Sequence, residues 1–323
     1  MNKSQRTIPV YFIGFWKHYL IQMRPYLFFI SGIAGLAGMA AYAEFSFFGG
    51  YSILLFIGFF FSYGFGQALT DCYQMDTDSI SAPYRPLSKG ILSVRSVKNV
   101  SIFGLLFVAF ILVFNNAYNL IFCVLSIGGL WTYSYFKKRF WLAGPFYNAW
   151  IVALLVFMGF LASSGNPISD LPNPNVIKPA LLTFFSYTNF VLIGYLKDIT
   201  ADKETGYQTF PVVFGWNRTV RVGDVFVLIC SIIYFTNFID NLPGIIFGIL
   251  ACVYAISGQI FAHVTQDKSE KNAAFPILAT VRSFILWHAG IIASFHPELT
   301  IFCILFYLAF ELIVYFRPMR EQI

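Results

Sequence analysis

Acidic side chains gather just after an apolar run, in residues 67–90, which read QALTDCYQMDTDSISAPYRPLSKG. If the helix of that run continues, each residue advances about 100° around its axis. Asp71, Gln74 and Asp78 then lie within about 60° of one another and form one polar stripe. Asp76 points to the opposite side unless the helix has already unwound. Such a stripe is a candidate ligand set for a hard divalent cation.

A second acidic stretch lies at residues 195–215, YLKDITADKETGYQTFPVVFG. Asp198 and Asp202 are four residues apart and therefore stack on one helix face, and Glu204 follows. Carboxylates at this spacing repel one another by roughly a few tenths of a kcal/mol in water. Near a bilayer the repulsion is larger, because the carboxylates also lose hydration. We therefore expect a cation to compensate each stripe.

Magnesium and phosphate together would satisfy both stripes. Mg²⁺ commonly binds one or two carboxylates and completes its shell with substrate phosphates and water. Arg85 lies between two prolines, Lys197 precedes the second stripe, and Lys137 begins a basic run. Arginine binds phosphate as a bidentate fork and lysine as a point charge. The residue types therefore predict a Mg²⁺-bound diphosphate, whose ester bond could ionise to leave an allylic cation. Ordinary solvated charges at helix ends would explain one stripe more readily than two.

The composition is that of an integral membrane protein. Of 323 residues, 58% are hydrophobic, 20% aromatic and only 11% charged, whereas soluble domains have about 25% charged residues. The net charge of +6 follows the loops on one side, so it predicts membrane orientation and no nucleic-acid partner. The five cysteines show no paired or CxxC spacing. We expect buried thiols, and neither a disulfide nor a zinc site.

Ten apolar runs approach the length of about 20 residues that crosses a bilayer. They cover residues 26–43, 51–69, 99–114, 117–136, 143–163, 177–196, 222–239, 243–263, 274–294 and 299–316. The ninth run contains Pro276, Arg282 and His288 and is the weakest. If it only dips into the membrane, nine spans remain. The sequence thus predicts an all-α polytopic membrane protein with nine to ten transmembrane helices.

The distribution of charge predicts which side each loop faces. With a cytoplasmic N-terminus, nearly all Lys and Arg side chains lie in the inner segments. The outer loops hold Glu44, Asp170, Asp240 and Glu298, and Lys178 is the one cation near that face. Positive charge on the inside is the usual rule for membrane proteins. Both acidic stretches then lie on the cytoplasmic face, in a bacterial inner membrane by our expectation.

The chain is expected to form a single membrane domain over residues 1–323. Residues 1–24 are predicted to be an interfacial segment and no signal peptide, because charged side chains interrupt the apolar stretch and no cleavage site follows. Gly32, Gly35 and Gly38 recur at three-residue spacing in the first span. Small residues let helix backbones approach closely in lipid, so we expect close helix packing there.

The two acidic stretches resemble motifs of the UbiA superfamily of intramembrane prenyltransferases. The first motif, NDxxDxxxD followed by YRP and a glycine, is similar to TDCYQMDTD and PYRPLSKG. The second, KDxxDxxxDxxxGxxTxPVxxG in its longer forms, is similar to KDITADKETGYQTFPVVFG with a shortened middle. Smaller similarities are Arg24-Pro25 before the first span and YSYFKKR followed by Asn148. The resemblance covers about residues 20–220, and the remainder more loosely.

The resemblance implies a helical bundle around a central cavity, with a cytoplasmic cap formed by the two Asp-rich loops. It implies transfer of an isoprenoid chain from its diphosphate to a lipophilic acceptor, first of all an aromatic one, in contact with membrane lipid and with Mg²⁺ as cofactor. The catalytic positions it implies are Asp71, Asp78, Asp198, Asp202, Lys197 and Tyr195. The metal ligands are Asp71, Gln74, Asp78, Asp198 and Asp202, with Asp76 as an additional option. The diphosphate-binding positions are Arg85, Lys137, Gln74, Arg24, Tyr133 and Lys89.

Three residues depart from the family's first motif. Thr70 replaces the leading Asn, Gln74 stands where an Asp metal ligand is expected, and Asp76 is additional. An amide oxygen can ligate a hard cation but brings no charge, so metal affinity should fall. Either Asp76 takes over through an unwound turn, or Gln74 holds a metal-bound water or the diphosphate. A tenth span also exceeds the family's usual nine.

Two other functions fit the same residues. A terpene cyclase would ionise the diphosphate and quench the cation within its own chain, and a cation transporter would use the acids as an ion path. Against a transporter, both stripes lie at one mouth of the bundle and not near the midplane. Tyr133, Tyr135 and Tyr195 either line the cavity and stabilise a cation or belong to an interfacial aromatic belt. The acceptor and the prenyl length stay open.

Overall fold

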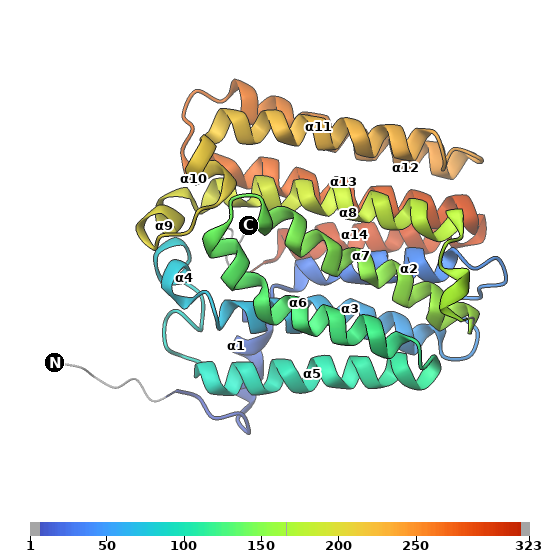
Figure 1. Ribbon diagram of the computed structural model, residues 1–323, viewed down its shortest axis with the longest axis horizontal. Coiled ribbons are helices and arrows are strands. Elements are labelled where there is room, and N and C mark those ends of the chain that lie inside the picture. The colour runs from blue at the N-terminus through green and yellow to red at the C-terminus, as the bar shows by residue number, and fades with distance from the viewer. Residues whose placement is uncertain (1–6, 166, 318–323) are drawn as a thin grey trace.

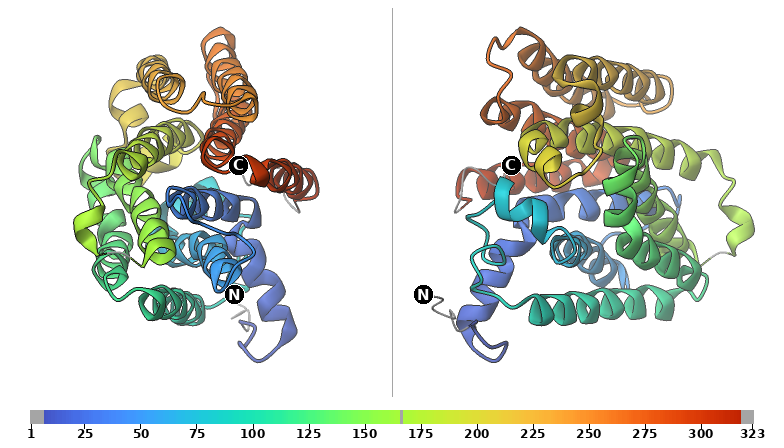
Figure 2. Two further views of the ribbon diagram at one scale, coloured as in Figure 1. Left: turned by 90° about the vertical axis from the view of Figure 1, so that its right-hand side faces the viewer. Right: turned by 60° about the vertical axis from the view of Figure 1, so that its left-hand side comes forward.

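The computed structural model describes residues 7–165 and 167–317, and within them every regular element is a helix (Figure 1). Ten longer helices run roughly alongside one another, and Figure 2 shows them nearly end-on in its left panel. Their bounds are α2 (Phe28–Ala40), α3 (Ser52–Asp71), α5 (Val94–Asn115), α6 (Asn119–Arg139), α7 (Ala143–Ser164), α8 (Pro174–Gly194), α11 (Trp216–Phe235), α12 (Leu242–Val264), α13 (Ala274–Phe295) and α14 (Thr300–Tyr315). The prediction of an all-α fold is confirmed.

The helices agree with a protein that spans a membrane. In the described chain, eight helices are long and apolar enough to cross a bilayer. A ninth crossing results if α1 (Ile13–Met23) and the segment Pro25–Ala40, which meet at 51°, count as one bent span. The helix α11 has 20 residues and is long enough to cross a bilayer. It is not among the eight apolar helices, because its first half carries the charged residues Arg218, Arg221 and Asp224. A tenth crossing through α11 stays a prediction.

The run that looked weakest in the sequence forms the most buried of the eight helices that are long and apolar enough to cross a bilayer. In α13, 89% of the residues in its most apolar stretch are buried inside the protein. The side chains of Arg282 and His288 are compatible with this burial, because each has a polar partner on a neighbouring helix. Arg282 forms a bidentate ion pair with Glu311 of α14, and His288 contacts Thr183 of α8. A helix that only dips into the membrane is therefore not supported.

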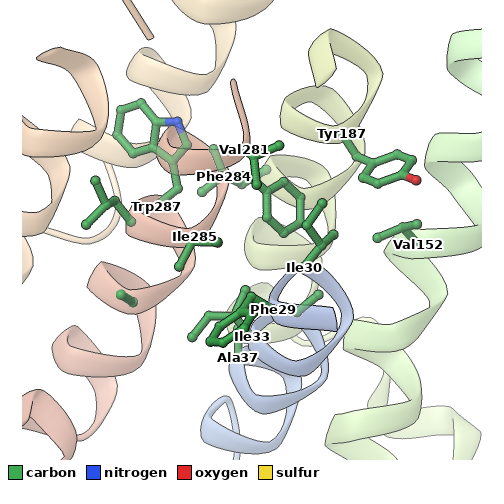
Figure 3. Close-up of a cluster of buried hydrophobic side chains, with 14 of the residues drawn as sticks. Phe29, Ile30, Ile33, Ala37, Val152, Tyr187, Val281, Phe284, Ile285 and Trp287 are labelled. Carbon is green, nitrogen blue, oxygen red and sulfur yellow. The ribbon is translucent and has the colours of Figure 1, made fainter. Parts of the chain in front are cut away.

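The core forms where α2, α7, α8 and α13 meet. All 13 residues of α2 are buried, as expected for a central helix that is apolar on every face. Ile30 and Ile33 of α2 face Val152 of α7 and Phe284 of α13 (Figure 3). Lipid is as apolar as these side chains, so van der Waals packing and not transfer from water holds the helices together.

The glycines of α2 permit this packing, as the sequence predicted. A Cβ atom on Gly38 would lie 2.1 Å from the carbonyl oxygen of Val156 on α7, and one on Gly35 would lie 2.3 Å from the ring of Phe59 on α3. A Cβ atom on Gly159 of α7 would likewise lie 2.2 Å from the carbonyl oxygen of Gly35 on α2. Backbone contacts of this kind fix α2 between its neighbours.

The two acidic stretches form short helices at one end of the bundle. These are α4 (Met75–Ser81), α9 (Ile199–Glu204) and α10 (Phe210–Phe214), preceded by the 3₁₀ turn η3 (Tyr195–Lys197) (Figures 1 and 2). The helix of the first stretch does not continue through residues 71–78. It ends at Asp71, the chain turns through Cys72–Gln74, and α4 starts afresh at Met75.

Candidate active site

A cavity lies at the end of the bundle that carries the short helices. Its lining brings together ten residues that the sequence predicted for the site: Arg24, Asp71, Gln74, Asp78, Arg85, Tyr133, Lys137, Tyr195, Lys197 and Asp198. Three carboxylates and four cationic side chains thus converge from segments that are up to 174 positions apart in the sequence, between Arg24 and Asp198.

Asp71 is the most fully bonded carboxylate of the cavity. Its two oxygens accept hydrogen bonds from Nη2 of Arg24 at 2.9 and 2.8 Å. The amides of Gln22 and Gln67 donate to it at 2.6 and 2.8 Å. The side chain of Arg85 approaches it at 3.9 Å. Asp71 therefore anchors cationic and amide side chains around the wall of the cavity.

The backbone of Arg24 aims its guanidinium at Asp71. Arg24 has φ 57° and is, in the described chain, the one non-glycine residue with positive φ. It lies at the bend between α1 and α2, where the two segments meet at 51°. A left-handed backbone costs about 1–2 kcal/mol for a residue with a Cβ. The charge-assisted hydrogen bonds to Asp71 offset that cost.

Arg85 and Asp78 form the second ion pair of the cavity. Nη1 of Arg85 lies 2.6 Å from Oδ2 of Asp78, and both side chains are nearly buried. Burial raises the pKa of Asp78, and the charges of Asp71 and Asp198 raise it further against the effect of Arg85. Burial alone would lower the pKa of Arg85, but Asp78 and Asp71 outweigh it and raise that pKa. Guanidinium does not lose its proton in proteins, so Arg85 places a positive charge beside Asp78.

Gln74 contacts Lys137 and Ser134 of α6. Its Oε1 accepts a hydrogen bond from Nζ of Lys137 at 3.1 Å, and its Nε2 donates to Oγ of Ser134 at 3.1 Å. The ammonium of Lys137 also lies 5.0 Å from the ring centre of Tyr195 and 5.1 Å from that of Tyr207. Such cation–π contacts stabilise a partly desolvated ammonium. Gln74 thus orients the cation of a neighbouring helix.

Asp202 does not line the cavity. It is fully buried and accepts hydrogen bonds from Thr77 at 3.1 Å and Thr209 at 3.0 Å. Nζ of Lys137 lies 3.7 Å from it. Burial raises the pKa of Asp202, and Lys137 opposes that rise. Asp202 therefore joins α4 to the loop before α10 and supports the wall behind Lys137.

Two further residues predicted for the site also lie away from the cavity. The carboxylate of Asp76 is 43% exposed and pairs with Lys138 at 2.9 Å, while the hydroxyl of Tyr207 donates to it at 3.1 Å. Burial would raise the pKa of Asp76, but Lys138, the backbone N–H of Thr77 and Tyr207 lower it. Lys89 is exposed. The helix does unwind before Asp76, but the side chain of Asp76 pairs with Lys138 outside the cavity lining.

Asp198 and Lys197 enter the cavity from the second stretch. The α-helix α8 tightens into the turn η3 just before them, and both side chains are partly exposed. In the described chain the carboxylate of Asp198 forms no hydrogen bond and no ion pair closer than 4 Å. Its charge nonetheless acts on Asp78 and Arg85. Asp198 is thus available to an incoming cation.

An apolar cavity adjoins the charged one. It is lined mainly by α3, α5, α6 and α7. The two cavities share five lining residues: Tyr63, Gln67, Thr70, Asn148 and Tyr187. The hydroxyls of Tyr63 and Tyr187 lie 2.8 Å apart at this junction. The shared residues therefore mark the boundary between a cavity lined by charged side chains and a cavity lined mainly by apolar ones.

The sequence left several of these residues unidentified. Gln22, Gln67, Tyr63 and Tyr187 were not assigned to the site, although polar side chains inside or beside an apolar run are a recognised functional signal. For Tyr133, Tyr135 and Tyr195 the sequence left two alternatives, a place in the cavity wall or in an interfacial belt, and the structure separates them. Tyr133 and Tyr195 line the cavity with their hydroxyls 2.7 Å apart. The side chain of Tyr135 is 56% exposed on α6.

The donor set of the cavity fits a hard cation that shares an anionic ligand. Within the described residues, no three His, Cys, Asp or Glu side chains converge closely enough to hold a metal by themselves. Asp78 and Asp198 could each supply a carboxylate to Mg²⁺, which takes its other ligands from phosphate and water. Nε of Arg24 and Nε of Arg85 are buried without a hydrogen-bond partner. Such orphaned donors suit an anion in the cavity.

Comparison with known proteins gives the same family as the motifs. Residues 29–288 match the model of the UbiA prenyltransferase family. A digeranylgeranylglyceryl phosphate synthase of Saccharolobus solfataricus is 25% identical over 234 residues, which are 71% of this chain and 81% of that protein. The apo structure of a UbiA homologue from Aeropyrum pernix has a TM-score of 0.70 at 17% identity, over 82% of this chain and 96% of that one.

A second solved structure has the same fold with ligands bound. The UbiA homologue from Archaeoglobus fulgidus bound to DMAPP and Mg²⁺ has a TM-score of 0.61 at 17% identity, over 83% of this chain and 98% of that one. The fold, the two motifs at one end of the bundle and the family match over residues 29–288 agree. The chain belongs to the UbiA prenyltransferase family.

Proposed function

We propose that this integral membrane protein is a Mg²⁺-dependent prenyltransferase, which moves an isoprenoid chain from its diphosphate to a lipophilic acceptor and releases pyrophosphate. One observation carries this proposal: a cavity of four cations and three carboxylates shares its inner wall with an apolar cavity. An isoprenoid diphosphate has the same division into a polyanionic head and a hydrocarbon tail. The head fits the charged cavity, and the tail fits the apolar one.

The cations of the site would bind and orient the diphosphate. Arg24 and Arg85 offer buried N–H groups, and Lys137 and Lys197 add point charges. Asp78 and Asp198 would hold Mg²⁺, which when bound neutralises charge on the leaving pyrophosphate. Preorganised positive charge of this kind stabilises a developing anion without reorganising solvent, and this is the largest catalytic contribution that we expect.

The bond that breaks would lie at the junction of the cavities. When the allylic C–O bond ionises, its electron pair goes to the pyrophosphate oxygen and the chain is left as an allylic cation. The paired hydroxyls of Tyr63 and Tyr187 lie at this junction, and aromatic faces attract cations. The acceptor forms a bond to the cationic carbon and loses its proton to the departing pyrophosphate.

We propose a lipophilic acceptor, and two chemical classes of acceptor are to be tested. The relative from Saccharolobus solfataricus is a digeranylgeranylglyceryl phosphate synthase, so a monoprenylated glyceryl phosphate is the first acceptor to try. An aromatic acceptor, expected from the motifs, is the second. The relatives named above are archaeal, so the proposed location is a prokaryotic cytoplasmic membrane, with the two motif loops as a cap on the cytoplasmic side.

The test is pyrophosphate release by the full chain in detergent, with geranylgeranyl diphosphate, Mg²⁺ and each acceptor in turn. Asp198→Ala should lower the rate by about 100-fold or more, because a carboxylate that holds the metal is lost. Asp170→Ala, an exposed acid in the loop between α7 and α8, is the matched control and should retain the rate. Full activity of Asp198→Ala would disprove the assigned metal ligand. A cyclic product that forms without any acceptor would show that the enzyme is a terpene cyclase and not a transferase.

A further inference from the structure

We propose that the far end of the apolar cavity limits the isoprenoid tail to about three units, the length of a farnesyl group. That end is formed by residues that we call the cavity floor: Phe59 of α3, Leu112 of α5, Cys123 of α6 and Met158 of α7. The inference rests on the proposed function, which puts the hydrocarbon tail in the apolar cavity, and it adds the length of that tail. The enclosure, the depth and the far end of the cavity carry it.

The apolar cavity is enclosed by the bundle. None of the described residues that line it is exposed on the protein surface. Its walls consist mainly of aliphatic side chains, such as Leu105, Val108 and Ile151. A tail that enters between these walls can therefore extend only as far as the walls themselves.

The cavity floor closes the space between the wall helices. Sγ of Cys123 lies 3.8 Å from Sδ of Met158, so α6 and α7 are in contact there. Phe59 is fully buried, and Leu112 and Met158 are each 2% exposed. Because protein interiors are close-packed, side chains in such contact leave no passage for a hydrocarbon chain.

A polar layer lies behind the cavity floor. Nδ2 of Asn119 lies 3.4 Å from the carbonyl oxygens of Leu112 and Met158. Nδ2 of Asn116 donates to the carbonyl oxygen of Leu161 at 2.8 Å. A longer tail could pass only by breaking these hydrogen bonds, and an unpaired amide in apolar surroundings is unfavourable. The polar layer therefore reinforces the floor as an end point for hydrocarbon.

The depth of the cavity follows from the rise of its wall helices. Gln67 and Asn148 lie at the junction with the charged cavity, where the bond to the diphosphate would break. Phe59 is eight residues from Gln67 on α3, and Met158 is ten residues from Asn148 on α7. At about 1.5 Å per residue, these intervals correspond to about 12 and 15 Å.

Three isoprene units match this depth. An extended chain of single bonds advances roughly 1.2 Å per bond, so a unit of four bonds takes about 5 Å. A geranylgeranyl tail has one unit more and would have to bend within the walls or press on the floor. A single misplaced methylene in an apolar pocket changes discrimination by about tenfold or more. One unit too many should therefore weaken binding at least that much.

The experiment compares tails of different length on the same head. Geranyl, farnesyl and geranylgeranyl thiolodiphosphates, whose bridging sulfur slows ionisation, are titrated with Mg²⁺ into the full chain in detergent, and calorimetry gives each affinity. The unaltered chain should bind the farnesyl compound about tenfold or more tighter than the geranylgeranyl one. Met158→Ala should remove that difference, because the shorter side chain deepens the cavity. Met39→Ala is the matched control and should keep the difference, since Met39 of α2 is as buried but lines neither cavity.

A substitution with the opposite effect keeps the inference testable if Met158→Ala does not fold. Ala109 lines the cavity about one turn before Leu112 on α5, on the side of the junction. Ala109→Leu should shorten the cavity and weaken binding of the farnesyl compound by about tenfold relative to the geranyl one. An unfolded fraction lowers the number of binding sites and leaves these ratios of affinity unchanged.

The outcomes separate the length of the tail from the proposed function. Equal affinity of the unaltered chain for the farnesyl and geranylgeranyl compounds would overturn the inference and leave the proposed function intact. A preference that changes with Leu278→Ala, on the α13 side of the charged cavity, and not with Met158→Ala would place the tail elsewhere and would also overturn the inference. A chain that binds none of the three compounds would overturn the proposed function itself.

Discussion

Arg85 shows how much depends on single side chains in the charged cavity. It pairs with Asp78 at 2.6 Å and approaches Asp71 at 3.9 Å, so it joins two of the three acids of the first motif. Removing one partner of a buried ion pair leaves the other charge without compensation, which typically costs about 3–5 kcal/mol. The same residue offers an unpartnered N–H to a ligand. A structural role and the proposed binding role therefore coincide in Arg85.

Arg85→Met should weaken binding of inorganic pyrophosphate in the presence of Mg²⁺ by about tenfold or more, because a charge-assisted donor is lost. Calorimetry on the full chain in detergent measures the affinity, and thermal unfolding measures the expected fall in stability. Lys89→Met is the control, because Lys89 lies four residues further on but is exposed. Equal effects of the two substitutions would contradict the geometry of the site.

Residue types at the site were predictable, but their individual roles were not. The motifs identified Asp71, Asp78 and Asp198, since acids in an apolar chain need a compensating partner. The sequence could not show that Asp202 faces inward to two threonines. The reason is the turn η3, after which α9 starts afresh at Ile199, so Asp198 and Asp202 do not lie on one continuous helix. Facing directions that depend on a helix break are not encoded in residue spacing.

At the scale of elements, the site depends on a close approach of α7 to the turn η3. A Cβ on Gly144, near the start of α7, would lie 2.2 Å from the hydroxyl of Tyr195. That hydroxyl lies 2.7 Å from the hydroxyl of Tyr133. The absence of a side chain at Gly144 thus leaves the space that the paired hydroxyls of Tyr133 and Tyr195 occupy.

Gly144→Ala should reduce kcat by about tenfold, since displacement of Tyr195 in the wall of the charged cavity shifts the bound head and misplaces the reacting atoms. The KM for the isoprenoid diphosphate should change less, because the cations that bind the head stay in place. Gly128→Ala on α6 is the matched control, since a Cβ there meets no atom within 4 Å. Steady-state pyrophosphate release gives both constants. Unchanged kcat for Gly144→Ala would show that the tyrosine pair has no part in turnover.

The contact of α2 with α7 should govern stability more than activity. Gly38→Ala would place a methyl group 2.1 Å from a backbone oxygen of Val156, and a backbone cannot yield as a side chain does. We expect a loss of about 1–3 kcal/mol, as for overpacked cores. Thermal unfolding in detergent measures it, again against Gly128→Ala. An unfolding temperature equal to that of the control would refute this close crossing.

Long helices were easier to predict than their interruptions. Apolar runs of membrane length identify the spans because lipid requires every backbone group to be bonded within the segment. The run with Arg282 and His288 looked doubtful, because the partners of these side chains, Glu311 and Thr183, lie on other helices. Only the folded arrangement shows that such polar groups are satisfied. The bend at Arg24 depends likewise on Asp71, a residue of another helix.

For the whole molecule, charge at one end and hydrocarbon beyond it define an orientation. All short helices of the motifs lie at the same end (Figure 1). In the proposed topology that end meets the cytoplasm, where basic loops are favoured. The loop between α7 and α8, with Ser169 and Asp170, would then face the opposite side.

The orientation can be tested with single cysteines in a chain whose partly exposed Cys72 and Cys252 are replaced by serine. A membrane-impermeant maleimide should label Lys89→Cys only in inverted vesicles and Ser169→Cys only in intact cells or spheroplasts, because both positions are exposed at opposite ends. Labelling of both variants from one side would exclude the proposed topology. Reversed labelling would place the motif end outside the cell.

The junction shared by the two cavities has a consequence for the direction of the reaction. Before the bond breaks, one molecule is held by charge at its head and by packing along its tail. Afterwards the two fragments prefer different phases, since pyrophosphate dissolves in water and the prenylated product in the bilayer. In the proposed binding mode, the attraction that retains the substrate across Tyr63 and Tyr187 ends when the bond breaks. The reverse reaction would have to recover its two reactants from separate solvents, so partition between phases helps to make the transfer one-way.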